Sequence, residues 1–213
     1  GFMAAWKNST KKEVVEQKLI AKSANAQFES LKNQLDPHFL FNSLNVLDSL
    51  IEENPVQAQR FTNSMSKIYR YVLEQKDKEL VSVEEEIDFA KTYCELLKTR
   101  FEDAVTFDFN ISEEDKKGFV VPLSLQLLLE NSIKHNFATS SKPLNIKIFT
   151  EKGNLIIENN LQTRELPNTS TGVGLANIVS RYNLLTERNV FVEKSEAFFR
   201  VKLPILTEKL NPM

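Results

Sequence analysis

The stretch VTFDFNI, residues 105–111, is where the hydrophobic pattern of the chain changes. Apolar and polar residues alternate along it, which is typical of a strand with one buried face. Strand-like stretches follow at residues 144–150, 154–160, 190–195 and 198–205. Helical spacing occurs between them at residues 122–137 and 174–187, and the turn at 151–154 predicts a hairpin. This order of elements predicts an α+β fold, a sandwich of a mixed sheet with helices on one face.

Upstream of these strands the spacing is helical, and only one of the five glycines precedes residue 118. A helix with one apolar stripe is predicted between Val14 and Phe41, and a partner helix is expected to cover that stripe. A second helix is predicted from about Pro55 to Gln75, and the linker IEENP at residues 51–55 predicts an antiparallel hairpin. A third helix at 82–101 begins with the spacing of a capping box.

The composition excludes several classes of protein. With 213 residues and 41% hydrophobic content the chain can bury a core, so disorder throughout is excluded. The 27 basic and 29 acidic residues nearly cancel, which argues against nucleic-acid binding. A single cysteine, Cys94, cannot form an internal disulfide. One cysteine and two histidines are also too few ligands for a structural zinc site. A reducing compartment fits best.

The chain contains no run of about 18 apolar residues and no apolar core of a signal peptide. We therefore expect this piece to be soluble and cytoplasmic, with no membrane contact of its own. Gly1 and Phe2 before Met3 look like an expression scar, which favours an excised part of a larger protein.

Polar groups gather in one turn of the segment LLLENSIKHN, residues 127–136. Glu130 and Lys134 share a helical face, as do Asn131 and His135. One interpretation is an intrahelical ion pair beside a solvated asparagine. The other is ligation of Mg²⁺ by carboxylate and amide oxygens, with phosphates completing its shell. This segment alone leaves both open.

In TSTGVGLANI, residues 169–178, Gly172 and Gly174 stand where a helix is predicted to begin. Glycine there lets a phosphate approach the unpaired amides of a first helical turn. An isolated pair of this kind is also compatible with a simple turn.

In QLDPHFLFNSLN, residues 34–45, helical spacing places His38, Asn42 and Asn45 on one face. Asp36 and Pro37 either begin a helix there or kink a longer one. A histidine on a helix is usually structural. Polar companions on its face favour an exposed imidazole, which is what a nucleophile needs.

These three segments, in this order, resemble the cytoplasmic part of sensor histidine kinases of the LytS-like family, over about residues 30–205. QLDPHFLFNSLN resembles the phosphoacceptor box, PLSLQLLLENSIKHN the N box and TGVGLANIVSRY the G box. The resemblance implies an N-terminal helical dimerisation and phosphoacceptor hairpin followed by an α/β-sandwich ATP-binding domain of the Bergerat (GHKL) type. The implied domains are a signalling linker helix at 1–30, dimerisation and phosphotransfer helices at 31–80, a connecting helix at 81–102 and the ATP-binding domain at 103–207.

The resemblance also implies roles for individual residues. His38 would attack the γ-phosphate of ATP, Asn131 would hold Mg²⁺ against the phosphates, and Glu130 would sit beside Asn131 to orient groups. The residues implied to contact ATP are Asn131, Lys134, His135, Asn159, Gly172, Gly174 and Leu175. Phosphoryl transfer depends mainly on positioning and charge neutralisation, and these residue types can supply both.

Two departures from the family pattern stand out. Phe39 follows His38 where many histidine kinases have an acidic residue, and the nearest acid is Asp36. Asn159 and Leu161 stand where related ATPases have an Asp-x-Gly motif that binds adenine. A neutral amide is a weaker acceptor than a carboxylate.

The first functional hypothesis is a homodimeric two-component sensor histidine kinase. It would autophosphorylate on His38 with ATP and Mg²⁺ and transfer the phosphoryl group to a response-regulator aspartate. Its parent would be anchored in a bacterial inner membrane. The alternative is a degenerate kinase that acts as a phosphatase or as a docking scaffold for a response regulator.

Overall fold

The computed structural model describes residues 37–75, 77–162 and 173–207, in two units that we treat separately, Gly1–Asn45 and Val46–Met213. Helix α2 (Pro37–Glu53) starts in the first unit. The apolar stripe predicted upstream lies mostly outside the described residues, as does Asp36, the predicted cap.

Helix α3 (Pro55–Gln75) follows α2 after a single residue, Asn54. The linker is therefore shorter than the five residues expected, because Asn54 caps α3 directly: its Oδ1 accepts a hydrogen bond from Gln57 N at 3.1 Å. One side of α3 is buried, as the spacing predicts. The buried apolar residues are Ala58, Phe61, Met65, Ile68 and Val72.

Helix α4 (Val83–Phe101) begins with the predicted capping box. Ser82 Oγ accepts from Glu85 N at 3.1 Å, and Glu85 Oε2 accepts from Ser82 N at 3.1 Å. Just before it, β1 (Val81–Ser82) pairs with β3 (Phe119–Val120) in a small antiparallel sheet. Strands of two residues are too short to show a hydrophobic period, so the sequence did not predict them.

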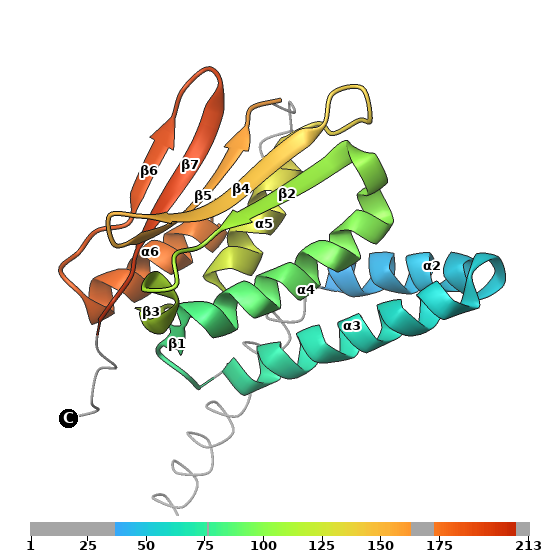
Figure 1. The fold of residues 1–213 in the computed structure, drawn as a ribbon, viewed down its shortest axis with the longest axis horizontal. Coiled ribbons are helices and arrows are strands. Elements are labelled where there is room, and N and C mark those ends of the chain that lie inside the picture. The colour runs from blue at the N-terminus through green and yellow to red at the C-terminus, as the bar shows by residue number, and fades with distance from the viewer. Residues whose placement is uncertain (1–36, 76, 163–172, 208–213) are drawn as a thin grey trace, which may run out of the picture. The chain divides into compact units, whose positions relative to one another are not determined.

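The main sheet has five strands in the order β2-β4-β5-β7-β6. Strands β2 and β4 are parallel and the other neighbours are antiparallel, which confirms a mixed sheet. Helices α4, α5 (Ser124–His135) and α6 (Val173–Leu185) lie on one face of it (Figure 1), so the predicted α+β class is also confirmed. The strands are β2 (Val105–Asn110), β4 (Leu144–Glu151), β5 (Asn154–Asn160), β6 (Phe191–Lys194) and β7 (Phe198–Pro204).

The predicted hairpin between β4 and β5 is confirmed as a tight turn. Lys152 and Gly153 both have positive φ, 50° and 69°, the conformation of a two-residue hairpin turn.

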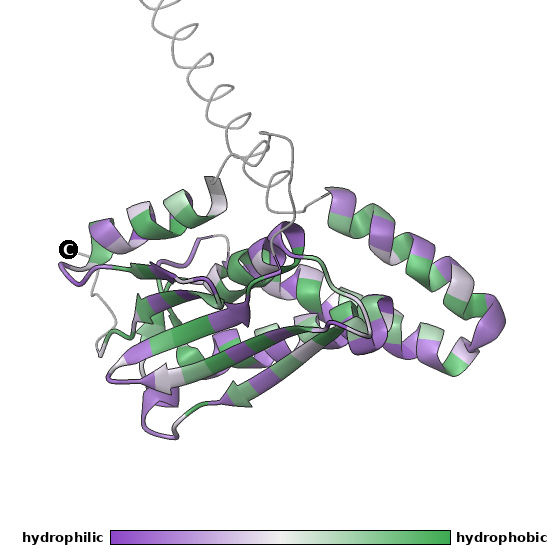
Figure 2. Cartoon of the chain, turned by 90° about the horizontal axis from the view of Figure 1, so that it is seen from above, coloured by the Kyte–Doolittle hydropathy of each residue, from purple (hydrophilic) through white to green (hydrophobic). Residues whose placement is uncertain are grey.

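Hydrophobic and hydrophilic residues alternate along much of the chain (Figure 2). The residues of the sheet buried beneath the helices include Leu144, Ile146, Ile148, Leu155, Ile157, Val201 and Leu203.

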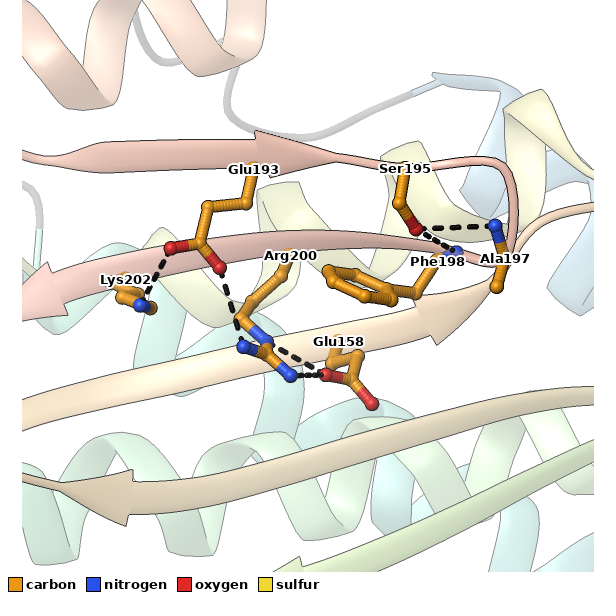
Figure 3. A network of polar contacts seen from close by, with 7 residues as sticks. All are labelled: Glu158, Glu193, Ser195, Ala197, Phe198, Arg200 and Lys202. Atoms are coloured by element: carbon orange, nitrogen blue, oxygen red, sulfur yellow. Dashed lines mark hydrogen bonds and ion pairs between the residues drawn. The ribbon is translucent and has the colours of Figure 1, made fainter.

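The opposite face of the sheet carries a row of charged residues at directly paired positions, one from each strand. Their signs alternate across the sheet in the order Asp108, Lys147, Glu158, Arg200, Glu193. Arg200 joins Glu158 and Glu193, and Lys202 Nζ donates to Glu193 Oε1 at 2.7 Å (Figure 3). Opposite charges on facing strands contribute about 0.2–1 kcal/mol each. We assign this face a structural role.

Candidate functional site

Helix α5 carries the N-box residues, and its first turn is capped from another helix. The residue before it, Leu123, has a φ of 64° and provides no side-chain cap. Glu86 of α4 supplies the acceptors: Oε1 accepts from Leu125 N at 2.9 Å and Oε2 from Leu123 N at 3.1 Å. A carboxylate at a helix N-terminus satisfies unpaired N–H groups and complements the helix dipole. The position of α5 is therefore tied to α4.

Glu86 is fully buried and also binds α3. Tyr71 donates its hydroxyl proton to Glu86 Oε2 at 2.9 Å. Burial raises the pKa of Glu86, while its hydrogen bonds and the charge of Arg181 oppose that rise. Burial and the neighbouring Glu86 carboxyl raise the pKa of Tyr71 as well. Helices α3, α4 and α5 thus meet at one buried carboxyl group.

Glu130, one of the predicted catalytic residues, lies on α5 and faces α4. Its Oε1 accepts hydrogen bonds from Tyr93 Oη at 3.0 Å and from Gln126 Nε2 at 2.9 Å. Tyr93 is only 1% exposed and Gln126 8%. Two buried donors therefore converge on a single oxygen of this half-buried carboxyl group.

Asn131 and Gly174 come together in space. A β-carbon built on Gly174 would lie 3.7 Å from Asn131 Nδ2 and 3.8 Å from a methyl carbon of Leu127. Gly174 stands in the first turn of α6, followed by the half-buried Leu175. Asn131 of the N box and Gly174, near the start of the G box, therefore lie close together, whereas Gly172 lies outside the described residues.

Lys134 and His135 occupy the last turn of α5. Lys134 is exposed and His135 is half-buried. Partial burial, together with the charges of Lys134 and of Lys194 on β6, lowers the pKa of His135. Two lysine side chains, of Lys134 and Lys194, therefore act on the imidazole at this end of α5.

Asn159, the predicted adenine-binding residue, is buried on β5 at 1% exposure. Ser132 Oγ donates to its Oδ1 at 3.1 Å, and its Nδ2 donates to Asn160 O at 2.8 Å. Asn136 strengthens the same junction, because its Oδ1 accepts from Gln162 N at 2.8 Å. The end of β5 is thus joined to α5, and Leu161 continues from it with its N bonded to Ala197 O at 3.0 Å.

His38 lies in the first turn of α2 and is exposed, as predicted. Asn42 Nδ2 is 3.1 Å from His38 Nδ1 and 3.2 Å from Nε2, so Asn42 can donate to the ring nitrogen that carries the lone pair. The shared face predicted for His38 and Asn42 is confirmed. Phe41 and Leu44, on the same helix, are 66% and 46% exposed.

Several supporting residues were not singled out in the sequence. Glu86 and Tyr93 lie seven residues apart on the buried side of α4, with Ala90 and Leu97 on the same stripe. The signal that could have revealed Glu86 is a charged residue within an apolar stripe, because a buried charge needs partners. Nothing in the sequence pairs Tyr93 with Glu130.

Among the described residues, no group of three or more His, Cys, Asp or Glu side chains could hold a metal ion. Within the same residues, no helix is both long and apolar enough to cross a membrane.

Comparison with known proteins finds similarity to sensor histidine kinases. A family model described as histidine kinase matches residues 26–105. The chain is 31% identical over 186 residues to the sensor histidine kinase YesM of Bacillus subtilis (strain 168), a match that covers 83% of this chain and 32% of that protein. It is 28% identical over 204 residues to the sensor histidine kinase YpdA of Escherichia coli (strain K12), covering 88% and 36%.

The chain therefore spans about a third of the length of these curated relatives. Among solved structures, the cytoplasmic segment of the histidine kinase QseC matches with a TM-score of 0.45 and 13% sequence identity, over 70% of this chain and 93% of that one.

Proposed function

Because the chain belongs to the histidine kinase family, we propose that it uses Mg²⁺-ATP to phosphorylate His38 and passes the phosphoryl group to an aspartate of a response regulator. The observation that supports the proposal is the approach of Gly174 to Asn131, which brings residues of two of the three boxes close together. The third box offers an exposed imidazole at the start of α2.

The residues of this site fit a nucleotide with its metal ion. The Oδ1 atom of Asn131 would be a hard ligand of the kind that Mg²⁺ accepts, with phosphate oxygens and water completing the shell. The ion would neutralise phosphate charge during the transfer. A cluster of carboxylates is not required for such a site.

The protein's own residues would hold the rest of the nucleotide. Lys134 and His135, in the last turn of α5, would contact the phosphates. Gly174 and Gly172 would let the phosphates approach the backbone at the start of α6, with Leu175 beside them. Asn159 would bind adenine through its amide, since an amide that already has one partner at each atom keeps a further lone pair and a further N–H.

The chemical step requires a lone pair on the imidazole. The unprotonated ring nitrogen of His38 would attack the γ-phosphorus, forming an N–P bond while the bond from phosphorus to the β–γ bridging oxygen breaks and ADP leaves. Asn42 would hold the ring in place beforehand by its hydrogen bond to this nitrogen, and that bond would be released as the nitrogen attacks. The other nitrogen would then release its proton to water, and Glu130 would orient groups in the ATP site. Transfer of the phosphoryl group to the receiver aspartate would break the N–P bond, and the ring would take up a proton from water to become neutral again.

We further propose that the protein acts as a homodimer through its helical part, because Phe41 and Leu44 expose apolar surface on the helix that bears His38. The domain boundaries proposed are those given by the resemblance, with dimerisation and phosphotransfer at 31–80 and ATP binding at 103–207. We propose that the chain lies in the cytoplasm as part of a membrane-anchored sensor. Its stimulus would act through the helix predicted between Val14 and Phe41.

The second candidate function is a degenerate kinase that serves as a phosphatase or a docking scaffold. The observation in its favour is Asn159, whose Oδ1 already accepts a hydrogen bond from Ser132 and carries no charge to attract the adenine amino group.

Incubation with γ-labelled ATP and Mg²⁺ tests the proposal and separates these candidates. The kinase predicts acid-labile label on the wild type that is absent from His38→Gln and Asn131→Asp. It also predicts loss of that label when a receiver domain is added. A wild-type chain that binds a receiver domain but neither binds ATP nor takes up label would favour the scaffold.

A further inference from the structure

Two buried donors meet at Glu130 Oε1. Tyr93 reaches it from α4 at 3.0 Å, and Gln126 reaches it from the preceding turn of α5 at 2.9 Å. A glutamate on a helix surface ordinarily samples several rotamers. Hydrogen bonds from two directions restrict the carboxyl group to one of them, and bonds to a charged acceptor are stronger than bonds between neutral groups.

The Tyr93 side chain is itself fixed in place. It is 1% exposed, and its ring lies 6.2 Å from the ring of Phe89 on the same helix. Phe89 stacks on Tyr71 of α3, with ring centroids 4.2 Å apart and planes at 15°. Because aromatic side chains have few rotamers, this stack leaves the Tyr93 hydroxyl little freedom.

The hydrogen bonding of the Gln126 side chain indicates a role beyond packing. Its Nε2 is bonded to Glu130, but within the described residues its Oε1 has no hydrogen-bond partner although it is buried. An unpaired buried acceptor is unfavourable, so this side chain is not optimised for stability alone. The side-chain hydrogen bond that Gln126 does make is the donation to Glu130.

We propose that Tyr93 is a positioning residue, assisted by Gln126, that holds the Glu130 carboxyl group in the orientation required for phosphoryl transfer to His38. This inference rests on the proposed kinase function. Since α3 follows the phosphoacceptor helix, the stack of Tyr71, Phe89 and Tyr93 also makes the orientation of Glu130 depend on how α3 packs against α4. Tyr93 acts through Glu130 and touches no reacting atom.

The test uses the whole chain and the variants Tyr93→Phe, Gln126→Met and Glu130→Gln. Removing the Tyr93 hydroxyl should lower the maximal rate of acid-labile labelling about tenfold, or roughly 1.4 kcal/mol of barrier, with the apparent KM for ATP within about twofold of wild type. Cys94→Ala is the control, because it alters the next buried residue of α4 without touching Glu130. It should keep the wild-type rate.

The double variant Tyr93→Phe/Glu130→Gln identifies the route of the effect. If Tyr93 acts through Glu130, the double variant labels at the rate of Glu130→Gln alone. A product of the two single effects would overturn the inference, as would a wild-type rate in Tyr93→Phe or in Glu130→Gln.

Folding is monitored by thermal unfolding of each variant. If Tyr93→Phe does not fold, Gln126→Met removes the second donor together with an unpaired acceptor, and a wild-type rate in that folded variant would overturn the inference. Failure of the wild type to take up label defeats the proposed function, and the inference with it. Labelling of the wild type with no effect of these variants defeats the inference alone.

Discussion

Gly174 lies so close to Asn131 that a β-carbon on the glycine would be 3.7 Å from the asparagine Nδ2. This distance is ordinary van der Waals contact, so the fold itself leaves room for a methyl group there. A side chain is excluded, in our proposal, by the phosphates that must approach the start of α6.

Gly174→Ala should therefore separate folding from binding. The variant should be as stable as wild type or slightly more so, because alanine favours a helix by up to about 1 kcal/mol relative to glycine. Its affinity for Mg²⁺-ATP should fall roughly tenfold, corresponding to about 1.4 kcal/mol. Calorimetric titration and thermal unfolding measure the two quantities. Ser180→Ala, an exposed change on the same helix, is the control, and unchanged ATP affinity in Gly174→Ala would contradict the assigned role.

His135 should respond to pH and to nucleotide. Its pKa lies below the ordinary value of 6.5, so the folded state binds a proton less readily than the unfolded chain does. Its contribution to the free energy of unfolding should therefore decline as pH falls below 6.5. NMR titration of His38→Gln, in which His135 is the one remaining histidine, measures this pKa directly.

Two changes should raise that pKa toward its ordinary value. Lys194→Gln removes a nearby positive charge, and a bound non-hydrolysable ATP analogue adds negative charge. A titration curve that does not move when the analogue saturates the protein would argue against phosphates near His135. Lys147→Gln, on the opposite face of the sheet, provides the control.

Glu86→Gln should destabilise the fold by about 1–3 kcal/mol. The two carboxyl oxygens of Glu86 each accept a hydrogen bond from a backbone N–H group. A glutamine amide has only one oxygen, so its NH2 group would face one of these backbone donors. Tyr71→Phe, which removes only the hydroxyl bonded to Glu86, should cost about 1 kcal/mol. Urea unfolding near neutral pH measures both variants, and equal stability of Glu86→Gln and wild type would be evidence against the cap.

The cost of Glu86→Gln should also depend on pH. The pKa of Glu86 is raised above its ordinary value of 4.5, so above pH 4.5 the folded state retains this proton more readily than the unfolded state. The advantage of wild type over Glu86→Gln should therefore shrink as pH rises from 4.5 and become constant above the raised pKa. An advantage that grows with pH in this range would contradict the direction of the shift.

Gly118→Ala should destabilise the fold by about 1–3 kcal/mol through overpacking. A β-carbon at Gly118 would lie 2.1 Å from Ile205 Cγ2, a distance that requires the neighbouring side chain to move. In a double-mutant cycle the penalty should be smaller in an Ile205→Ala background, where that atom is absent. Equal penalties in both backgrounds, measured by urea unfolding, would place the strain elsewhere.

The elements of the fold were predictable where the relevant information is local. Ser82 and Glu85 form their capping box within one turn, and β2 follows from alternation over residues 105–111. Strands β1 and β3 were not predictable because each has two residues and is defined by its partner. The proximity of Asn131 and Gly174 depends on the packing of α5 against α6. The sequence therefore identified the two motifs but did not show that they lie close together.

The supporting residues of the site were harder to predict from the sequence. Tyr93 stands at a position of α4 that looks like an ordinary member of a helix with a buried side, and Glu86 is marked only as a charge within the apolar stripe. Their significance arises from contacts with residues more than thirty positions away, Leu125 and Glu130. Such pairings are set by how helices pack, and no spacing within a single chain segment encodes them.

Mass spectrometry of the chain after incubation with Mg²⁺-ATP tests most directly whether His38 accepts the γ-phosphoryl group. The sample is kept at alkaline pH, because phosphohistidine is labile in acid. We expect one phosphoryl group, located on His38, in the wild type and none in Asn131→Asp. A phosphoryl group on another residue, or an unmodified His38 in wild-type protein that has bound ATP, would contradict the proposed function.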